Sequence, residues 1–134
     1  GGMYGGMTVT TPHYDDIIVL KINAESNIEW GRSIFKRSTS PSYNAFIKND
    51  KLHIILNSGK SITVKNDGRK KVSKGFLEST SLYDFEYSNK GEVSHNKIQD
   101  NKNKTNYTPY HGNYENDKFI MISEGNNPKF MILE

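Results

Sequence analysis

The stretch that decides the fold is Asn49-Asp50-Lys51-Leu52-His53-Ile54-Ile55-Leu56-Asn57-Ser58, because it recurs 67 residues later as Asn116-Asp117-Lys118-Phe119-Ile120-Met121-Ile122-Ser123-Glu124-Gly125. In both copies a polar Asn-Asp-Lys turn leads into an apolar run that ends in small or polar residues. Asn and Asp suit tight turns because their side chains bond to nearby backbone and tolerate left-handed conformations. Self-similarity at a fixed spacing is typical of stacked supersecondary units, so the pair predicts a repeat architecture.

A second pair of segments repeats at a spacing of 65 residues. Residues 18–28 and residues 83–93 share one pattern, in which an apolar run leads into a polar turn and the chain then returns. The run from Ile17 to Ile22 is short and rich in β-branched residues, which predicts a buried strand. The two spacings are nearly equal, so both indicate one unit of roughly 65 residues that occurs twice.

Turn residues divide the chain into successive antiparallel hairpins. The expected strand pairs are 17–22 with 28–35, 43–47 with 51–56, 82–87 with 92–98 and 110–114 with 118–123, followed by a strand at 130–133. A small protruding hairpin is expected within 57–80, and a polar loop over 99–109. No segment has the period of an amphipathic helix, so the chain is predicted to be all-β.

Composition narrows the class of protein. The 134 residues have the size of one ordinary domain, and they include 34% hydrophobic residues with eight Tyr against one Trp, which is typical of half-buried β-structure. The net charge of +3 is too small to argue for nucleic acid. The chain has no Cys, which excludes disulfides, zinc-thiolate sites and thiol nucleophiles. No apolar run approaches the about 20 residues of a transmembrane helix, so no transmembrane segment is expected.

The beginning of the chain is Gly-rich and carries no recognisable leader. Residues 1–7 have neither a basic region nor an apolar stretch, so no signal peptide is visible. Residues 1–13 are interpreted as a Gly-rich initial segment ahead of the repeats, and we expect that residue 1 is not the native start.

The first repeat resembles a known family. Asp16–Asn23 together with Ile28–Gly31 resembles the strand-turn-strand repeat of propeller-like proteins of the Bacteroidota cell envelope. The turn in that family often reads Asp-Gly or Lys-Gly, as at Lys90-Gly91, whereas Glu25-Ser26 departs from it. The resemblance implies antiparallel hairpins arranged as roughly two β-propeller-like blades.

The two blades would cover 14–80 and 81–134, with the basic stretch 57–80 as an insertion. A closed propeller has 4–8 blades, and an isolated pair would expose apolar faces and sheet edges. We therefore expect 14–134 to be part of a larger propeller or to be completed by a partner. A β-sandwich built from the same hairpins is the structural alternative.

The resemblance also implies a setting and a role. It places the chain outside the cytoplasm, in the periplasm or at the outer membrane, as a non-enzymatic interaction or structural module. A protein partner in a larger envelope complex is expected, and an accessory subunit of the type 9 secretion machinery is the specific version. The alternative is a carbohydrate-binding or adhesin module. The sequence has no nucleophile-base pair, paired-carboxylate motif or phosphate loop, so we expect no enzyme activity.

Candidate binding residues fall in a basic cluster and in a Tyr-rich segment. The partner-binding candidates are Lys65, Arg69, Lys70, Lys71, Lys74, Tyr107 and Tyr110. The cluster suits an acidic partner, whereas nucleic acid is disfavoured because no aromatic residue lies between Lys60 and Gly75 to stack on bases. Tyr offers a rigid amphipathic contact surface to a protein partner.

Four residues are assigned structural roles, and no cofactor is expected. Trp30 and Gly91 are expected to pack between repeat units, and Asp50 and Asp117 to form turns. The four histidines are scattered along the chain without the spacing of a metal site, so no metal is predicted.

Overall fold

The prediction of an all-β fold is confirmed. The computed structural model describes residues 6–12, 16–35, 43–64, 70–73 and 78–134, which form twelve strands and no helix. The strands are β1 (Gly6–Pro12), β2 (Asp16–Asn23), β3 (Ile28–Phe35), β4 (Tyr43–Lys48), β5 (Lys51–Ser58), β6 (Ser61–Val64), β7 (Lys70–Ser73), β8 (Ser81–Tyr87), β9 (Val93–Asp100), β10 (Tyr107–Glu115), β11 (Lys118–Ser123) and β12 (Phe130–Leu133). Within the described part of the chain, no helix could span a membrane.

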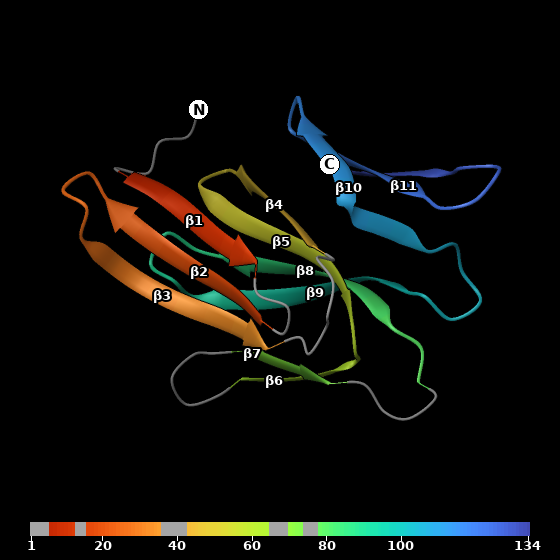
Figure 1. Ribbon diagram of the computed structural model, residues 1–134, viewed down its shortest axis with the longest axis horizontal. Coiled ribbons are helices and arrows are strands. Elements are labelled where there is room, and N and C mark those ends of the chain that lie inside the picture. Colours follow the sequence, from red (N-terminus) through yellow and green to blue (C-terminus); the bar gives the residue numbers. More distant parts are fainter. Residues whose placement is uncertain (1–5, 13–15, 36–42, 65–69, 74–77) are drawn as a thin grey trace.

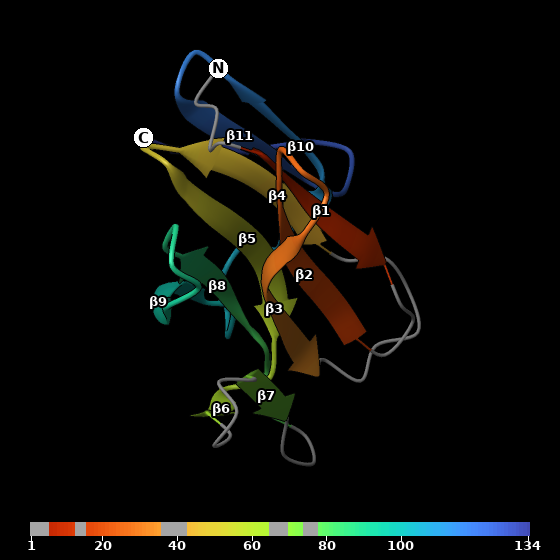
Figure 2. The ribbon, with the colours of Figure 1, turned by 90° about the vertical axis from the view of Figure 1, so that its left-hand side faces the viewer.

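The strands form three sheets that follow one another along the chain. The first sheet has the order β1-β2-β3-β7-β6, the middle sheet β4-β5-β8-β9, and the last sheet β10-β11-β12. Neighbouring strands pair antiparallel except β3 and β7, which run parallel. Figures 1 and 2 show β1, β2 and β3 beside the middle sheet, with β10 and β11 next to β4.

The middle sheet is covered on both faces, and β5 shows this most clearly. Leu52, Ile54 and Leu56 point to one face and share a core with Ile17 and other residues of the first sheet. Ile55 points to the opposite face and packs in a second core with the last sheet. A strand covered on both faces carries an almost continuous apolar run, which explains the run that the sequence shows here. The molecule is therefore three stacked layers with two cores.

The two copies of the Asn-Asp turn adopt the same backbone conformation. Asn49 and Asp50 have φ values of 52° and 60°, and Asn116 and Asp117 have 53° and 61°. Positive φ at both central residues of a two-residue loop is the type I′ turn, whose twist matches that of the flanking strands. The turn roles assigned to Asp50 and Asp117 agree with this geometry.

The second repeat is equally regular in structure. In the β2–β3 turn the N–H of Asn23 donates to the carbonyl of Asn27, and the Asn23 side chain accepts from two backbone N–H groups. In the β8–β9 turn Ser88 makes the same bonds, with Glu92 in the place of Asn27. Both residues of each turn are therefore related by the spacing of 65 that the sequence shows.

Three local expectations were wrong. Residues 6–12 are not merely an initial segment, because β1 pairs with β2 along its whole length. The hairpin of β6 and β7 does not protrude, since β7 adds to β3 and Val72 is buried in the first core. The polar loop is shorter than expected, because β9 extends to Asp100 and β10 begins at Tyr107.

Candidate functional site

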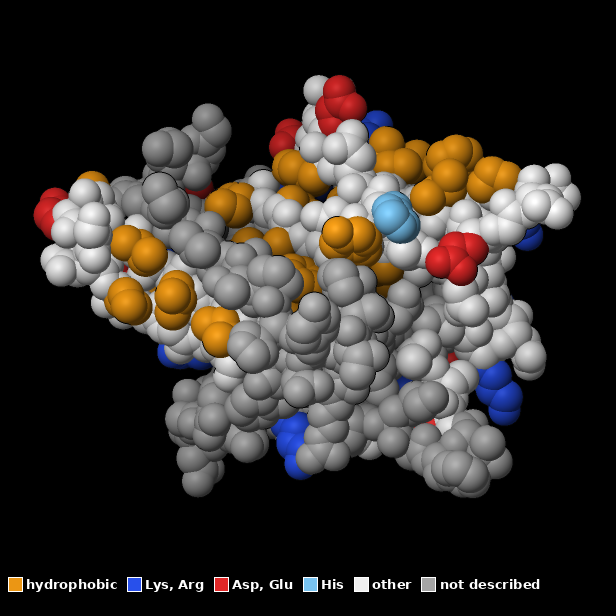
Figure 3. Space-filling model, in the orientation of Figure 1, with side chains coloured by type: hydrophobic (Ala, Val, Ile, Leu, Met, Phe, Trp, Pro, Cys, Tyr) orange, Lys and Arg blue, Asp and Glu red, His pale blue; other side chains and the backbone are white. Residues whose placement is uncertain are grey.

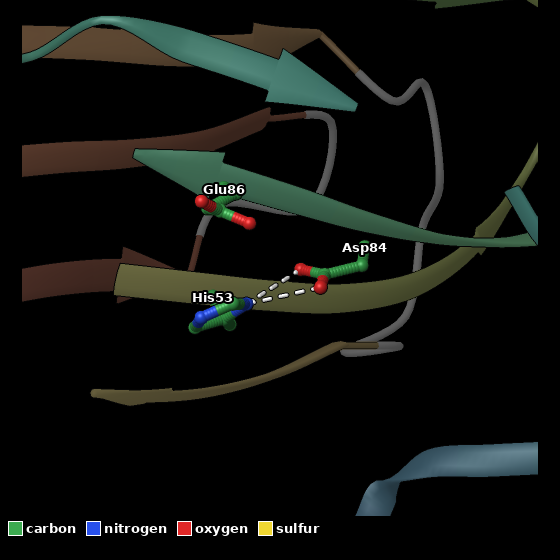
Figure 4. Close-up of side chains that lie close together, drawn as sticks. All are labelled: His53, Asp84 and Glu86. Carbon is green, nitrogen blue, oxygen red and sulfur yellow. Dashed lines mark hydrogen bonds and ion pairs between the residues drawn. The ribbon is translucent and has the colours of Figure 1, made fainter. Parts of the chain in front are cut away.

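The strongest cluster of chemically active side chains lies on the middle sheet, on the face that it turns toward the last sheet. Strands β5 and β8 pair antiparallel, with His53 opposite Glu86 and Ile55 opposite Asp84. His53, Asp84 and Glu86 therefore share one face, and their possible ligand atoms lie within 4.8 Å of one another (Figure 4). Sequence analysis missed this cluster because strand register, which no local spacing reveals, brings it together.

Each member of the cluster already has a partner. His53 Nδ1 lies 2.9 Å and 3.1 Å from the two carboxylate oxygens of Asp84. Glu86 forms an ion pair of 2.9 Å with Lys51, its diagonal neighbour on β5. The ring of Phe46 stacks on His53 with centroids 5.1 Å apart. The three side chains are half-buried, so water reaches them.

These contacts favour a cross-strand brace over a reactive centre. One imidazole and two carboxylates could bind a divalent cation, but Asp84 occupies His53 Nδ1 and Lys51 neutralises Glu86. A histidine held by a carboxylate also resembles a catalytic pair, yet His53 has no hydroxyl partner among the described residues. The cluster thus joins β5 to β8 through two pairs of opposite polarity.

The joint between the middle and last sheets uses polar side chains to bind irregular backbone. The register of β10 shifts between Thr108 and Asn113, which leaves carbonyls without a ladder partner. The Asn44 amide donates to the carbonyls of Pro109 and Gly112 at 3.1 Å and 2.9 Å. Such bonds satisfy buried carbonyls and fix the sheet on its neighbour.

Aromatic rings fill the centre of the same joint. Phe46 on β4 stacks on Tyr114 and Phe119 of the last sheet, with centroid separations of 4.5 Å and 4.9 Å. The Lys48 ammonium donates to the carbonyl of Asp117 at 2.8 Å, so the β4–β5 hairpin also holds the turn of its own repeat copy.

The joint between the first and middle sheets contains the predicted structural pair. Trp30 stacks on Tyr87 with centroids 6.0 Å apart, and its Nε1 donates to the carbonyl of Asn89 at 3.0 Å. Gly91 has a φ of 84°, and a Cβ there would lie 2.9 Å from the Trp30 ring. Arg32 donates to the Gly91 carbonyl at 3.1 Å. Trp30 and Gly91 therefore pack together between two sheets, as a structural role requires.

The predicted partner-binding residues do not form one surface in the described structure. Lys70 is only 3% exposed, and its ammonium donates to His95 Nδ1 at 3.0 Å. Tyr107 packs against the second core, whereas Tyr110 is 51% exposed. Lys71 is half-buried on β7. Lys65, Arg69 and Lys74 lie outside the described residues. The binding role of this set stays a prediction, with Lys70 and Tyr107 contributing packing.

An exposed apolar face lies on the outside of the last sheet. We call it the β12 face, and its residues are Ile120, Ile122, Phe130 and Ile132. Strand register places Ile120 opposite Ile132 and Ile122 opposite Phe130. Phe130 is 64% exposed and Ile132 is 52% exposed, while Ile120 and Ile122 are half-buried. Four contiguous apolar side chains on a sheet surface mark an interaction site.

A second apolar face lies on the outside of the first sheet. We call it the β2 face, and its residues are Ile18, Leu20, Ile22 and Ile28. Alternation along β2 places the first three opposite to the buried Ile17 and Val19, and Ile28 pairs with Ile22. Figure 3 shows hydrophobic side chains gathered over β2 and β3 and, at the other end of the molecule, over β10 and β11.

No protein-family model, curated protein or solved structure matches the chain.

Proposed function

We propose that the chain is a non-enzymatic interaction module that contributes three consecutive sheets to a larger stack of sheets. The observation that carries the proposal is the β12 face, where exposed apolar side chains occupy a sheet surface that has no cover among the described residues. Fully burying one Ile or Phe side chain is worth about 1.5–3 kcal/mol, so covering this face would be strongly favourable.

The middle sheet supports the proposal by example. Its face toward the last sheet is half apolar and half polar, and it is covered by aromatic stacking and by side chain to carbonyl bonds. The last sheet presents a more apolar outer face than that, and β12 is an edge strand within the described structure. An uncovered apolar face beside an open strand edge is the arrangement that proteins use to bind further β-structure.

The expected setting of the module follows from the resemblance of its first repeat. We propose that it acts in the cell envelope of a Bacteroidota bacterium, as one part of a propeller-like assembly with a protein partner. An accessory role in an outer-membrane complex such as the type 9 secretion machinery is the specific form of this proposal, and it depends on the resemblance alone.

A carbohydrate-binding role gains no support from the described aromatic residues. Trp30 would be the natural sugar platform, but its ring stacks on Tyr87 and its Nε1 is bonded to Asn89. Tyr110 is the exposed alternative, and its ring already contacts His111 edge to face.

The test asks whether the β12 face is a docking surface or part of the chain's own core. The double variant Phe130→Glu, Ile132→Glu removes its exposed half, and Asn126→Glu, Asn127→Glu adds the same charge in the neighbouring exposed loop. We expect the wild-type chain and the loop variant to bind a hydrophobic fluorescent dye. The β12 variant should bind much less dye and keep the wild-type melting temperature.

Two results would contradict the proposal. If the β12 variant unfolds while the loop variant does not, the face belongs to the core. If the wild-type chain binds no dye, the face is already covered.

A further inference from the structure

We propose that two copies of this chain bind head to tail, with the β12 face of one copy packed on the β2 face of the next. The inference rests on the proposed function, because it names the occupant of the β12 face. It follows from the way in which the repeat orders the faces of the three sheets.

Each sheet has a forward face, turned to the next sheet along the chain, and a backward face, turned to the previous one. The first sheet uses Ile17 and Val19 on its forward face, in the first core. The middle sheet uses Leu52 and Phe85 on its backward face and Ile55 on its forward face. Both joints therefore place a forward face against a backward face.

The spacing of 65 residues identifies the β2 face as a backward face. The matching turn bonds of Asn23 and Ser88 fix the register of this repeat in the structure. In that register, the β2 residues of the face correspond to Tyr83, Phe85 and Tyr87 on β8. Those three residues form the backward face of the middle sheet, where they pack in the first core. The β2 face thus has the character of a surface that receives another sheet.

The spacing of 67 residues identifies the β12 face as a forward face. The matching type I′ turns fix the register of this repeat. In that register, Ile122 corresponds to Ile55 and Ile120 corresponds to His53, which are forward-facing residues of the middle sheet. The half-buried His53 of the middle sheet is replaced by Ile in the last sheet, so the outer copy of the face is the more apolar one.

The two ends of the molecule are therefore complementary in kind. The chain ends in a forward face on one side and in a backward face on the other, and forward against backward is the contact that it makes twice internally. A contact between unlike faces leaves one free face of each kind on the dimer, so growth continues until a ring closes or a filament forms. A contact between like faces would stop at the dimer.

The experiment uses sedimentation velocity of the whole chain over a series of concentrations. The wild-type chain is expected to associate beyond the dimer. A β12 variant, Phe130→Glu with Ile132→Glu, and a β2 variant, Ile18→Glu with Ile28→Glu, should each be monomeric alone. Mixed in equal amounts they should form a dimer and stop, because each variant retains the one face that the other lacks.

Controls keep the folding and the charge of the variants in view. Asn126→Glu with Asn127→Glu carries the same added charge and should associate as the wild-type chain does. Because Ile18 is only 37% exposed, Ile28→Glu alone, at a position 62% exposed, serves as a second β2 variant if the double variant does not fold. Circular dichroism melting curves establish that each variant is folded.

Three outcomes overturn the proposal. Dimers of the β2 variant alone would mean that like faces bind each other. A mixture that stays monomeric would mean that the two faces do not bind. A wild-type chain that is monomeric at every concentration but still binds the hydrophobic dye would assign the β12 face to another partner, and would leave the proposed function standing.

Discussion

At the scale of single residues, the joint between the first and middle sheets depends on a glycine and a tryptophan. Gly91 adopts a φ of 84°, and its missing side chain leaves room for the Trp30 ring. Gly125 offers a natural comparison, because it has a φ of 110° but nothing within 4 Å of the place where a Cβ would be. The two glycines separate the cost of backbone strain from the cost of a collision.

We expect Gly91→Ala to lower the free energy of unfolding by more than Gly125→Ala does. Both changes place a side chain at positive φ, which costs about 1 kcal/mol. Gly91→Ala should cost about 1–3 kcal/mol more, because the Trp30 ring must move. Urea denaturation measures both values, and equal losses in the two variants would show that Trp30 does not pack on Gly91 as described.

At the scale of the element, the Asn-Asp turns fix two hairpins, and their second residues differ in side-chain contacts. Asp50 and Asp117 both have φ near 60°. The Asp117 carboxylate also accepts a hydrogen bond from the Tyr114 hydroxyl at 3.1 Å. Because Gly suits the second position of a type I′ turn best, the two positions allow backbone and side-chain effects to be compared.

Asp50→Gly should stabilise the protein by about 0.5 kcal/mol, since it relieves positive φ at a cost in unfolded-chain entropy. Asp117→Gly should gain less or lose stability, because it also removes the bond to Tyr114. Asp50→Val should destabilise by about 1 kcal/mol or more, as a β-branched residue resists this conformation. Thermal melting of the three variants is the measurement, and tolerance of Asp50→Val would rule out the type I′ geometry.

Strands β7 and β9 form a contact that responds to pH. The Lys70 ammonium donates to His95 Nδ1, so the imidazole accepts at this nitrogen and is neutral. Partial burial, followed by the positive charge of Lys70, lowers the pKa of His95 below its usual value near 6.5. The unfolded chain therefore binds more protons than the folded chain just below that pH, and stability rises with pH there.

We expect the midpoint of urea denaturation to fall as the pH drops below about 6.5, and to fall less in His95→Gln. Lys70→Met should also reduce the slope, because it removes the charge that opposes protonation. The effect is small, since His95 remains exposed to solvent. A pH profile that is identical in the wild-type chain and in His95→Gln would remove the basis of this contact.

The sequence predicts the hairpins well because their signals are local. The Asn-Asp turns, the alternation along β8 and the apolar run of β5 each lie within one short segment. The parallel pairing of β3 with β7 has no local signal, since it joins residues far apart in the chain. For the same reason the buried position of Lys70 and the meeting of His53 with Asp84 could not be read from spacing.

At the scale of the whole molecule, the repeat explains both the stack and its open ends. Three sheets make two joints of one kind, so the forward face of the last sheet and the backward face of the first remain exposed. The resemblance to propeller-like repeats and the stacked sheets both lead us to expect a larger assembly. The duplicated turn thus specifies a unit that is complete only when its end faces are covered.

Cross-linking between copies tests this most directly, because the chain has no cysteine of its own. Phe130→Cys lies on the β12 face and Ile28→Cys on the β2 face, both at exposed positions. The two variants, one of them isotopically labelled, are mixed and oxidised, and the masses of the disulfide-linked dimers are measured. Head-to-tail packing predicts mostly mixed dimers of one variant with the other; dimers formed mainly within each variant would contradict it.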